Sequence, residues 1–128
     1  MPILVVDDDA TIRLLLSTLL DEEGYVVTLA TNGQEALASL HAADPLPCVI
    51  ILDLMMPIMS GWEFLHIRQA DPVVQCIPVV AMSAAHGVAA SVAALNVQEA
   101  LVKPIDFDHL LDILQRYCSG APPPGAWS

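Results

Sequence analysis

Acidic, hydroxyl and basic side chains follow four of the short apolar runs in this sequence. Asp7 and Asp8 follow the first run, Asp53 and Ser83 follow two central runs, and Lys103 follows the last. Three neighbouring carboxylates repel one another and need a cation if all are to stay ionised. Oxygen-only ligands suit a hard ion such as Mg²⁺, with Mn²⁺ as a substitute, whereas zinc would want thiolate or imidazole ligands. The acids therefore predict a Mg²⁺ site.

The remaining two groups extend this prediction to phosphate chemistry. Lys103 is the only lysine in the chain and supplies a positive charge suited to a phosphoryl group, and the hydroxyl of Ser83 can donate to a phosphoryl oxygen. Phosphoryl transfer requires little beyond positioning and charge neutralisation. Because a carboxylate can act as the nucleophile, the set matches acceptance of a phosphoryl group on one aspartate.

Each acid also has an ordinary structural interpretation. An aspartate after a strand is commonly a turn residue or a helix cap, and we expect this role for Asp9. The ordinary interpretation is weaker for the whole set, because an acid pair, a single acid, a hydroxyl and an ammonium would all have to follow strands by chance.

Two alternating kinds of segment must position these residues. Short apolar runs rich in β-branched residues predict strands at residues 3–6, 26–29, 49–52, 77–82 and, more weakly, 100–102. They do not alternate with polar residues, which is typical of parallel strands buried on both faces. Helical spacing and turn residues predict helices near residues 12–19, 34–40, 61–69, 87–95 and 107–114, with Gly24 ending the first and Asp106 opening the last.

Five alternations of strand and helix predict an α/β fold, a flavodoxin-like, doubly wound (βα)5 sandwich with a parallel five-stranded sheet of order 2-1-3-4-5. In this order the direction of winding reverses between the first and third strands, at the edge where all strands end. We therefore expect Asp7, Asp8 and Asp53 to share one crevice, with Ser83 and Lys103 on its far rim.

Composition restricts the class of protein. The 128 residues are 55% hydrophobic, which excludes a disordered chain, and the net charge of −11 argues against binding to nucleic acid or an anionic membrane. Neither a signal peptide nor a membrane-spanning segment is expected. We predict one domain over residues 1–118 and a Pro/Gly-rich tail, or the start of a linker, over residues 119–128.

Three cysteines, Cys48, Cys76 and Cys118, lie far apart in the sequence and form no CxxC pair. Their odd number cannot pair fully within one chain. We therefore expect reduced thiols and a cytoplasmic location.

Five motifs make the sequence resemble the receiver domains of bacterial two-component response regulators, the family of the single-domain chemotaxis regulator. They are ILVVDDD at residues 3–9, NGQEAL at 32–37, ILDLMMPIMSG at 51–61, VAMSA at 80–84 and LVKP at 101–104. The resemblance covers residues 3 to 118, and its central motif and the spaced Lys-Pro pair are its most specific parts.

The resemblance implies a role for each residue of the site. Asp53 would accept a phosphoryl group from the phosphohistidine of a sensor histidine kinase or a phosphotransfer protein. Asp8 would bind Mg²⁺ directly, Asp7 largely through water, and the backbone carbonyl of Met55 would complete the protein's share of the metal ligands.

The rim residues have implied roles too. Ser83 and Lys103 would each contact a phosphoryl oxygen, and the bond between Lys103 and Pro104 would be cis. Phosphorylation would then switch the surface of the fourth helix, fifth strand and fifth helix, which would contact a downstream protein or a second copy of the chain.

Three positions depart from the family pattern, and one of them, Ser60 where many relatives have Asp, should matter less than the other two. Ala100 stands where receivers often carry an aromatic ring that moves with the hydroxyl of Ser83, so this coupling cannot operate in its usual form. Met55 is apolar where relatives place polar residues, and we expect an altered rate of self-dephosphorylation.

Two alternatives accompany the leading hypothesis of a signalling module that catalyses only its own phosphorylation and dephosphorylation. An aspartate-nucleophile phosphatase would need a second aspartate at the position of Met55. A phosphorylation-independent interaction module is permitted by Ala100 but disfavoured by the intact acids and Lys103.

Overall fold

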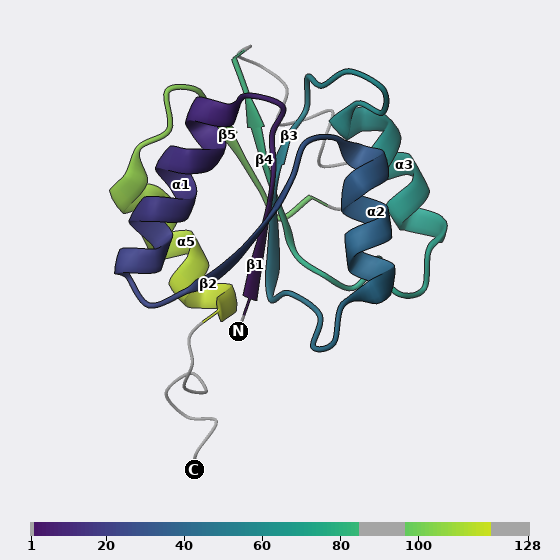
Figure 1. Cartoon of the computed structure of the whole chain (residues 1–128), viewed down its shortest axis with the longest axis horizontal. Helices are drawn as coiled ribbons and strands as arrows, with labels where there is room; N and C mark the ends of the chain where they lie inside the picture. Colours follow the sequence, from purple (N-terminus) through teal and green to yellow (C-terminus); the bar gives the residue numbers. More distant parts are fainter. Residues whose placement is uncertain (1, 85–96, 119–128) are drawn as a thin grey trace.

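The computed structural model describes residues 2–84 and 97–118 and contains a central sheet of five parallel strands in the order β2-β1-β3-β4-β5. Helices α1 and α5 cover one face of this sheet, and α2 and α3 cover the other (Figure 1). This arrangement confirms the predicted α/β fold and strand order. The elements are β1 (Pro2–Val6), α1 (Ala10–Glu22), β2 (Val26–Ala30), α2 (Gly33–Ala42), β3 (Val49–Asp53), α3 (Gly61–Ala70), β4 (Val79–Ser83), β5 (Glu99–Val102) and α5 (Phe107–Cys118).

Short polar side chains start the helices on the side where the strands end. Asp9 caps α1 by accepting a hydrogen bond from the Thr11 amide, and Asn32 caps α2. Ser60 and Glu63 form a reciprocal capping box at the start of α3. The cap role expected for Asp9 is thus confirmed, and α1, α2 and α3 each follow a strand and begin near the same edge of the sheet.

The expectation that all strands are buried on both faces is correct only for the centre of the sheet. Every residue of β3 and β4 is buried, as are four of the five residues of β1. β2, by contrast, has exposed residues, with Val26 exposed by 64%, because it lies at the edge of the sheet. Side chains of the central strands build two apolar clusters, one beneath α2 and α3 and one beneath α1 and α5.

Two of the cysteines are joined, so the expectation that all three are reduced is wrong. Cys48, directly before β3, forms a disulfide with Cys118, the last residue of α5, across a sequence separation of 70 residues. Distance along the sequence was a poor guide because a parallel sheet brings the start of β3 and the end of α5 to the same side of the molecule. Cys76 is exposed and carries a free thiol.

Two sequence-based predictions fall outside the described residues. They are the helix at residues 87–95, with its proposed contact surface, and the tail at residues 119–128. Among the helices that the structure describes, none has the length and hydropathy needed to cross a bilayer.

Candidate functional site

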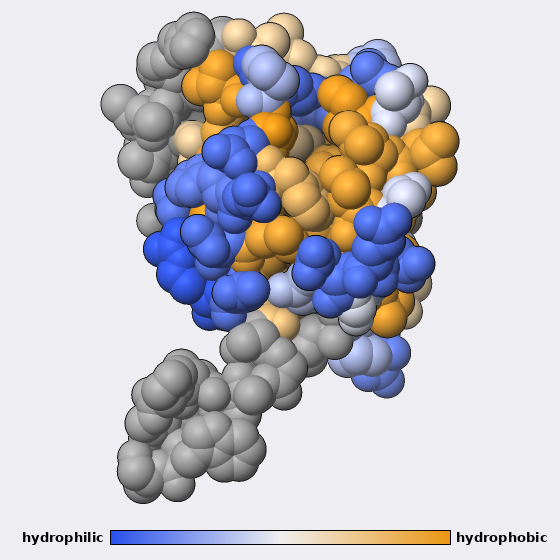
Figure 2. All heavy atoms as spheres, turned by 90° about the vertical axis from the view of Figure 1, so that its left-hand side faces the viewer, coloured by the Kyte–Doolittle hydropathy of each residue, from blue (hydrophilic) through white to orange (hydrophobic). Residues whose placement is uncertain are grey.

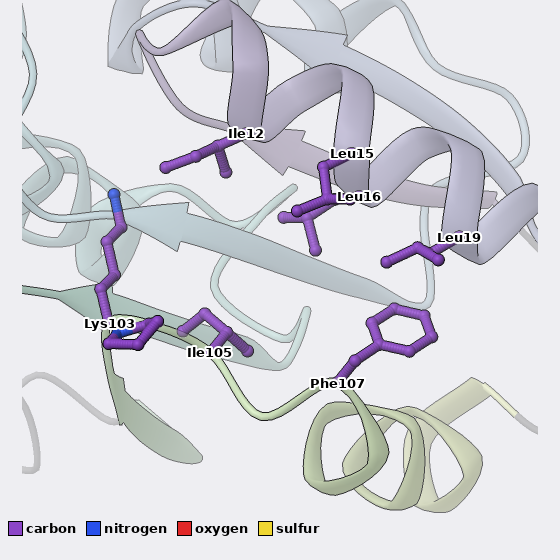
Figure 3. Close-up of a pocket in the computed structure, with 8 residues that line it drawn as sticks. Ile12, Leu15, Leu16, Leu19, Lys103, Ile105 and Phe107 are labelled. Atoms are coloured by element: carbon purple, nitrogen blue, oxygen red, sulfur yellow. The ribbon is translucent and has the colours of Figure 1, made fainter.

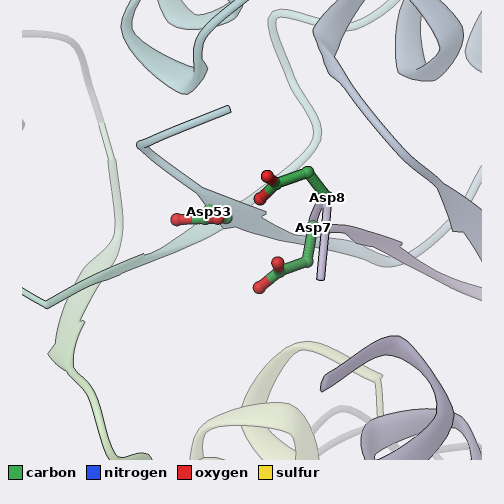
Figure 4. Close-up of side chains that lie close together, drawn as sticks. All are labelled: Asp7, Asp8 and Asp53. Atoms are coloured by element: carbon green, nitrogen blue, oxygen red, sulfur yellow. The ribbon is translucent and has the colours of Figure 1, made fainter. Parts of the chain in front are cut away.

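Three carboxylates meet where β1 and β3 end (Figure 4). These strands are neighbours, with Val6 paired to Leu52, so the residues that follow, Asp7 and Asp53, lie side by side. One carboxylate oxygen from each of Asp7, Asp8 and Asp53 lies within 4.8 Å of the other two. Asp7 and Asp53 are buried and Asp8 is exposed, so the cluster opens to solvent on one side.

Lys103 reaches this cluster from the end of β5. Its Nζ atom lies 3.1 Å from Oδ2 of Asp7 and 3.6 Å from Oδ2 of Asp53. Its backbone is fixed by a hydrogen bond of 2.7 Å from the Lys103 amide to the carbonyl of Ser83 on β4. The peptide bond between Lys103 and Pro104 is cis. The ammonium group therefore faces the two buried carboxylates directly.

The electrostatics of the pocket make ionisation of Asp53 less favourable than usual when no cation is bound. Burial raises the pKa of Asp53 from 3.8 to about 6, and the charges of Asp7 and Asp8 add to this increase. A hydrogen bond from the Met55 amide and the charge of Lys103 act in the opposite direction on this pKa. An added positive charge would therefore favour the ionised form of Asp53.

Backbone contacts hold the two buried acids in place. Oδ1 of Asp7 accepts a hydrogen bond of 2.9 Å from the Asp9 amide, and Oδ1 of Asp53 accepts one of 3.1 Å from the Met55 amide. The guanidinium of Arg13 donates to the Asp7 carbonyl at 2.6 Å. The sequence analysis did not identify Arg13, and its one sequence signal is its position on the first turn of the helix that follows the acids.

Gly61 is a second residue that the sequence analysis did not assign to the site. A Cβ atom at this position would lie 2.4 Å from the Asp53 carbonyl oxygen and 2.6 Å from Cα of Leu54. The Gly61 amide also donates to the Leu54 carbonyl at 3.1 Å. The start of α3 thus packs directly on the backbone of Asp53, the residue predicted to accept a phosphoryl group. This close packing explains why the central motif ends in a glycine, Gly61.

The other predicted site residues, Ser83, Met55 and Ala100, differ in their exposure to solvent. Ser83 is buried at the end of β4, the strand that pairs with β3 through Asp53 and Met82. The side chain of Met55 is 68% exposed on the loop after β3. Ala100 lies on β5 opposite Ala81 and packs against the cluster beneath α2 and α3.

An apolar groove borders the acidic pocket. It lies between α1 and the segment from β5 to α5 and has a volume of about 450 Å³ (Figure 3). Apolar side chains also gather on this face in the space-filling view (Figure 2). The groove is lined by Ile12, Leu15, Leu16, Leu19, Lys103, Pro104, Ile105 and Phe107. Lys103 therefore belongs to both the groove and the pocket.

The donor set fits a divalent cation with hard oxygen ligands. Three ionised carboxylates and one ammonium leave a formal charge of 1 − 3 = −2, which an ion of charge +2 balances. Within residues 2–84 and 97–118, no sulfur or imidazole ligand belongs to the cluster. Carboxylate ligands and an opening to water are what Mg²⁺ prefers, because this ion keeps several of its water ligands.

Comparisons with known proteins agree with this geometry. The sequence profile of the family described as response regulator receiver domain matches residues 3–115. An uncharacterised 14.6 kDa protein of Leptolyngbya boryana is 38% identical over 125 residues, which cover 96% of this chain and 94% of the relative. Response regulator PleD of Caulobacter vibrioides is 42% identical over 107 residues, which cover 81% of this chain but 23% of that longer protein.

Solved structures show the same fold. The chemotaxis protein CheY4 of Vibrio cholerae has a TM-score of 0.81 and 33% identity, with 91% of this chain and 97% of that one covered. Response regulator TrrA of Thermotoga maritima, solved in complex with Mg²⁺ and BeF, has a TM-score of 0.79 and 31% identity, with the same shares covered. The acids and the lysine of this pocket thus lie in a fold shared with these proteins.

Proposed function

Because the chain belongs to the response regulator receiver domain family, we propose that Asp53 accepts a phosphoryl group from a phosphohistidine. The observation that carries this proposal is the position of Asp53, buried at the end of β3 between two further acids and 3.6 Å from the ammonium of Lys103. An oxygen of Asp53 forms a bond to phosphorus while the bond from phosphorus to the donor imidazole breaks. The imidazole leaves with its electron pair and takes up a proton.

Asp7, Asp8 and Asp53 would hold Mg²⁺, or Mn²⁺ in its place, together with the backbone carbonyl of Met55. When bound, the ion supplies positive charge that offsets the charge of the phosphoryl oxygens. The charge balance of the pocket supports this assignment, as does the neighbouring structure of TrrA, which was solved with Mg²⁺.

Ser83 and Lys103 are the two groups that would contact the transferred phosphoryl oxygens. Two observations support these roles: Ser83 ends the strand next to β3, and Nζ of Lys103 lies 3.6 Å from Oδ2 of Asp53. The output would pass through the surface of the fourth helix, β5 and α5 to a downstream protein or a second copy of the chain. Since Ala100 carries no ring, Ser83 would act through backbone shifts of β4 and β5.

The apolar groove explains how a protein donor could be positioned. A phosphohistidine on a helix must approach Asp53 while its own helix rests on the receiver. Leu15, which lines the groove, is 55% exposed on α1, and Lys103 joins the groove to the pocket. We propose that the apolar face of the donor helix packs here, and that this exchange takes place in the cytoplasm, where sensor kinases use ATP.

Incubation with acetyl phosphate and Mg²⁺, followed by intact-mass measurement, tests the proposal. We expect the mass of one phosphoryl group to be added to the wild-type chain and to be absent from Asp53→Asn and from samples treated with a chelator. Turnover of acetyl phosphate without accumulation on the protein would indicate a phosphatase. No reaction with either acetyl phosphate or phosphorylated kinases would indicate a phosphorylation-independent module.

A further inference from the structure

Among the described residues, the disulfide between Cys48 and Cys118 is the main attachment of the end of α5 to the sheet. In the last four residues of this helix, Gln115 and Arg116 are exposed and Tyr117 is partly buried, whereas Cys118 is buried and bonded to Cys48. Apart from Cys118, the buried side chains of this helix, Leu110, Ile113 and Leu114, all lie before this last turn.

The other contacts that this turn makes with described residues are weak. Arg116 donates to Glu99 at 3.1 Å, but the two side chains are 59% and 32% exposed. Exposed ion pairs of this kind contribute little to stability. Tyr117 packs only partly against the cluster beneath α1 and α5. The disulfide is therefore the contact whose loss would free the last turn.

Cys48, on the other side of the bond, is held firmly. Its amide donates to the carbonyl of Pro2 at 2.9 Å, and the next residue begins the fully buried strand β3. The two sulfurs thus differ in setting, one at the base of the sheet and the other at a helix end. Helix ends open more readily than buried strands, so an attacking thiol can reach the bond when the last turn of α5 frays.

We propose that the bond between Cys48 and Cys118 is a reversible redox site that attaches the last turn of α5 when oxidised and releases it when reduced. Its reaction partner is a dithiol, either a small molecule or a protein thiol–disulfide oxidoreductase. This inference goes beyond the proposed phosphorylation, and only its cytoplasmic setting rests on the proposed function. Disulfides in that compartment are usually transient or regulatory, because its thiol pool is reducing.

The exchange balances without any other reactant. One thiolate of the dithiol attacks a sulfur of the bond, forms a mixed disulfide and displaces the other cysteine as a thiolate, which takes up a proton. The second thiol of the dithiol then attacks the mixed disulfide and releases the first cysteine. Two electrons and two protons pass to Cys48 and Cys118, and the dithiol becomes a disulfide.

The structure offers a matched control in Cys76, whose exposed thiol takes no part in the bond. Alkylation of the native protein followed by mass measurement should label one cysteine per chain before reduction and three after dithiothreitol. Cys76→Ser should be labelled at none before reduction and two after it. Labelling of all three cysteines before reduction, in protein first equilibrated with oxidised glutathione, would overturn the proposal.

Equilibration in glutathione buffers of graded ratio tests reversibility. We expect the native protein to pass from bonded to reduced and back across this range, while hydrogen exchange at residues 115–118 becomes at least tenfold faster in the reduced form. Cys118→Ala should show the fast exchange in every buffer. The proposal would be contradicted if the disulfide stayed intact in all buffers until the protein unfolds, or if hydrogen exchange did not change after reduction. The bond would then be a permanent structural link. The wild-type measurements decide the matter even if the variant fails to fold, and none depends on phosphorylation of Asp53.

Discussion

The ammonium nitrogen of Lys103 lies 3.1 Å from the carboxylate of Asp7, although 96 residues separate them in the sequence. The side chain of Lys103 thus reaches from the end of β5 to the residue that follows β1, and its ammonium nitrogen also lies 3.6 Å from the carboxylate of Asp53. The same ammonium that would contact a phosphoryl group therefore neutralises part of the acidic pocket before phosphorylation.

Replacing Lys103 should have opposite effects on metal binding and on phosphorylation. We expect Lys103→Met to bind Mg²⁺ about tenfold more tightly, since a unit charge within several ångströms repels a divalent ion by about 1–2 kcal/mol even in water-like surroundings. Phosphorylation by acetyl phosphate should slow at least tenfold, because the charge that stabilises the transferred group is lost. Calorimetry and intact-mass kinetics measure the two effects. Arg116→Met, which removes an exposed cation, is the control, and equal changes in both variants would contradict this role.

Asp53→Asn should stabilise the metal-free protein in a pH-dependent way. Burial raises the pKa of Asp53 from 3.8 to about 6, so its ionisation costs the folded state more than the unfolded state. This cost is absent below pH 4, grows as the pH rises towards 6 and is complete above 6, where it reaches at most about 3 kcal/mol.

Urea unfolding in the presence of a chelator, from pH 4 to pH 8, measures this effect. The difference in free energy of unfolding between Asp53→Asn and the wild type should increase over that interval in favour of the variant. Added Mg²⁺ should reverse the order, because only the wild type keeps all three acids. A difference that does not change with pH would contradict the assigned pKa.

Leu15 should matter for a protein donor and not for a small one. Leu15→Asp places a charge in the apolar groove and should slow phosphoryl transfer from the fastest donor in a panel of phosphorylated histidine kinases by at least tenfold. Phosphorylation by acetyl phosphate should stay within twofold. Leu14→Asp is the matched control, because Leu14 is 67% exposed on the same helix and does not line the groove. Equal slowing in the two variants would exclude the groove as the docking surface.

Two glycines that start helices allow a test of how the pocket is built. A Cβ atom at Gly61 would meet the Asp53 backbone at 2.4 Å, whereas one at Gly33 would meet chiefly the flexible side chain of Met59, at 2.8 Å. We expect Gly61→Ala to lower the free energy of unfolding by about 2–4 kcal/mol and to slow phosphorylation, and Gly33→Ala to cost about 1 kcal/mol or less. Equal costs in urea unfolding would show that the loop after β3 moves freely.

The sequence was sufficient to predict the fold and the meeting of the acids. Buried parallel strands read as short apolar runs, and strand order follows from their alternation with helices, so Asp7 and Asp53 could be placed at one edge of the sheet. The exposure of β2 was missed because its run is as apolar as the central ones, although the predicted strand order already placed this strand at an edge.

Contacts that depend on exact tertiary distances could not be predicted. The pairing of Cys48 with Cys118 requires the end of α5 to lie at the foot of β3, and no spacing rule connects two such positions. The same holds for Gly61, whose lack of a side chain matters only because the start of α3 packs on the Asp53 carbonyl. Cap residues such as Asp9 were predictable, since capping is a local interaction.

The short strand β3 connects the disulfide at Cys48 with the acidic pocket at Asp53. Its five residues run from the position after Cys48 to Asp53, so a sulfur held by α5 and the reacting carboxylate lie at opposite ends of one buried segment. A slip of this strand by one residue would turn every side chain to the other face of the sheet. The pairing of β3 with β1 and β4 opposes such a slip, and the disulfide at the foot of the strand adds a covalent constraint to the alignment on which the direction of the carboxylate depends.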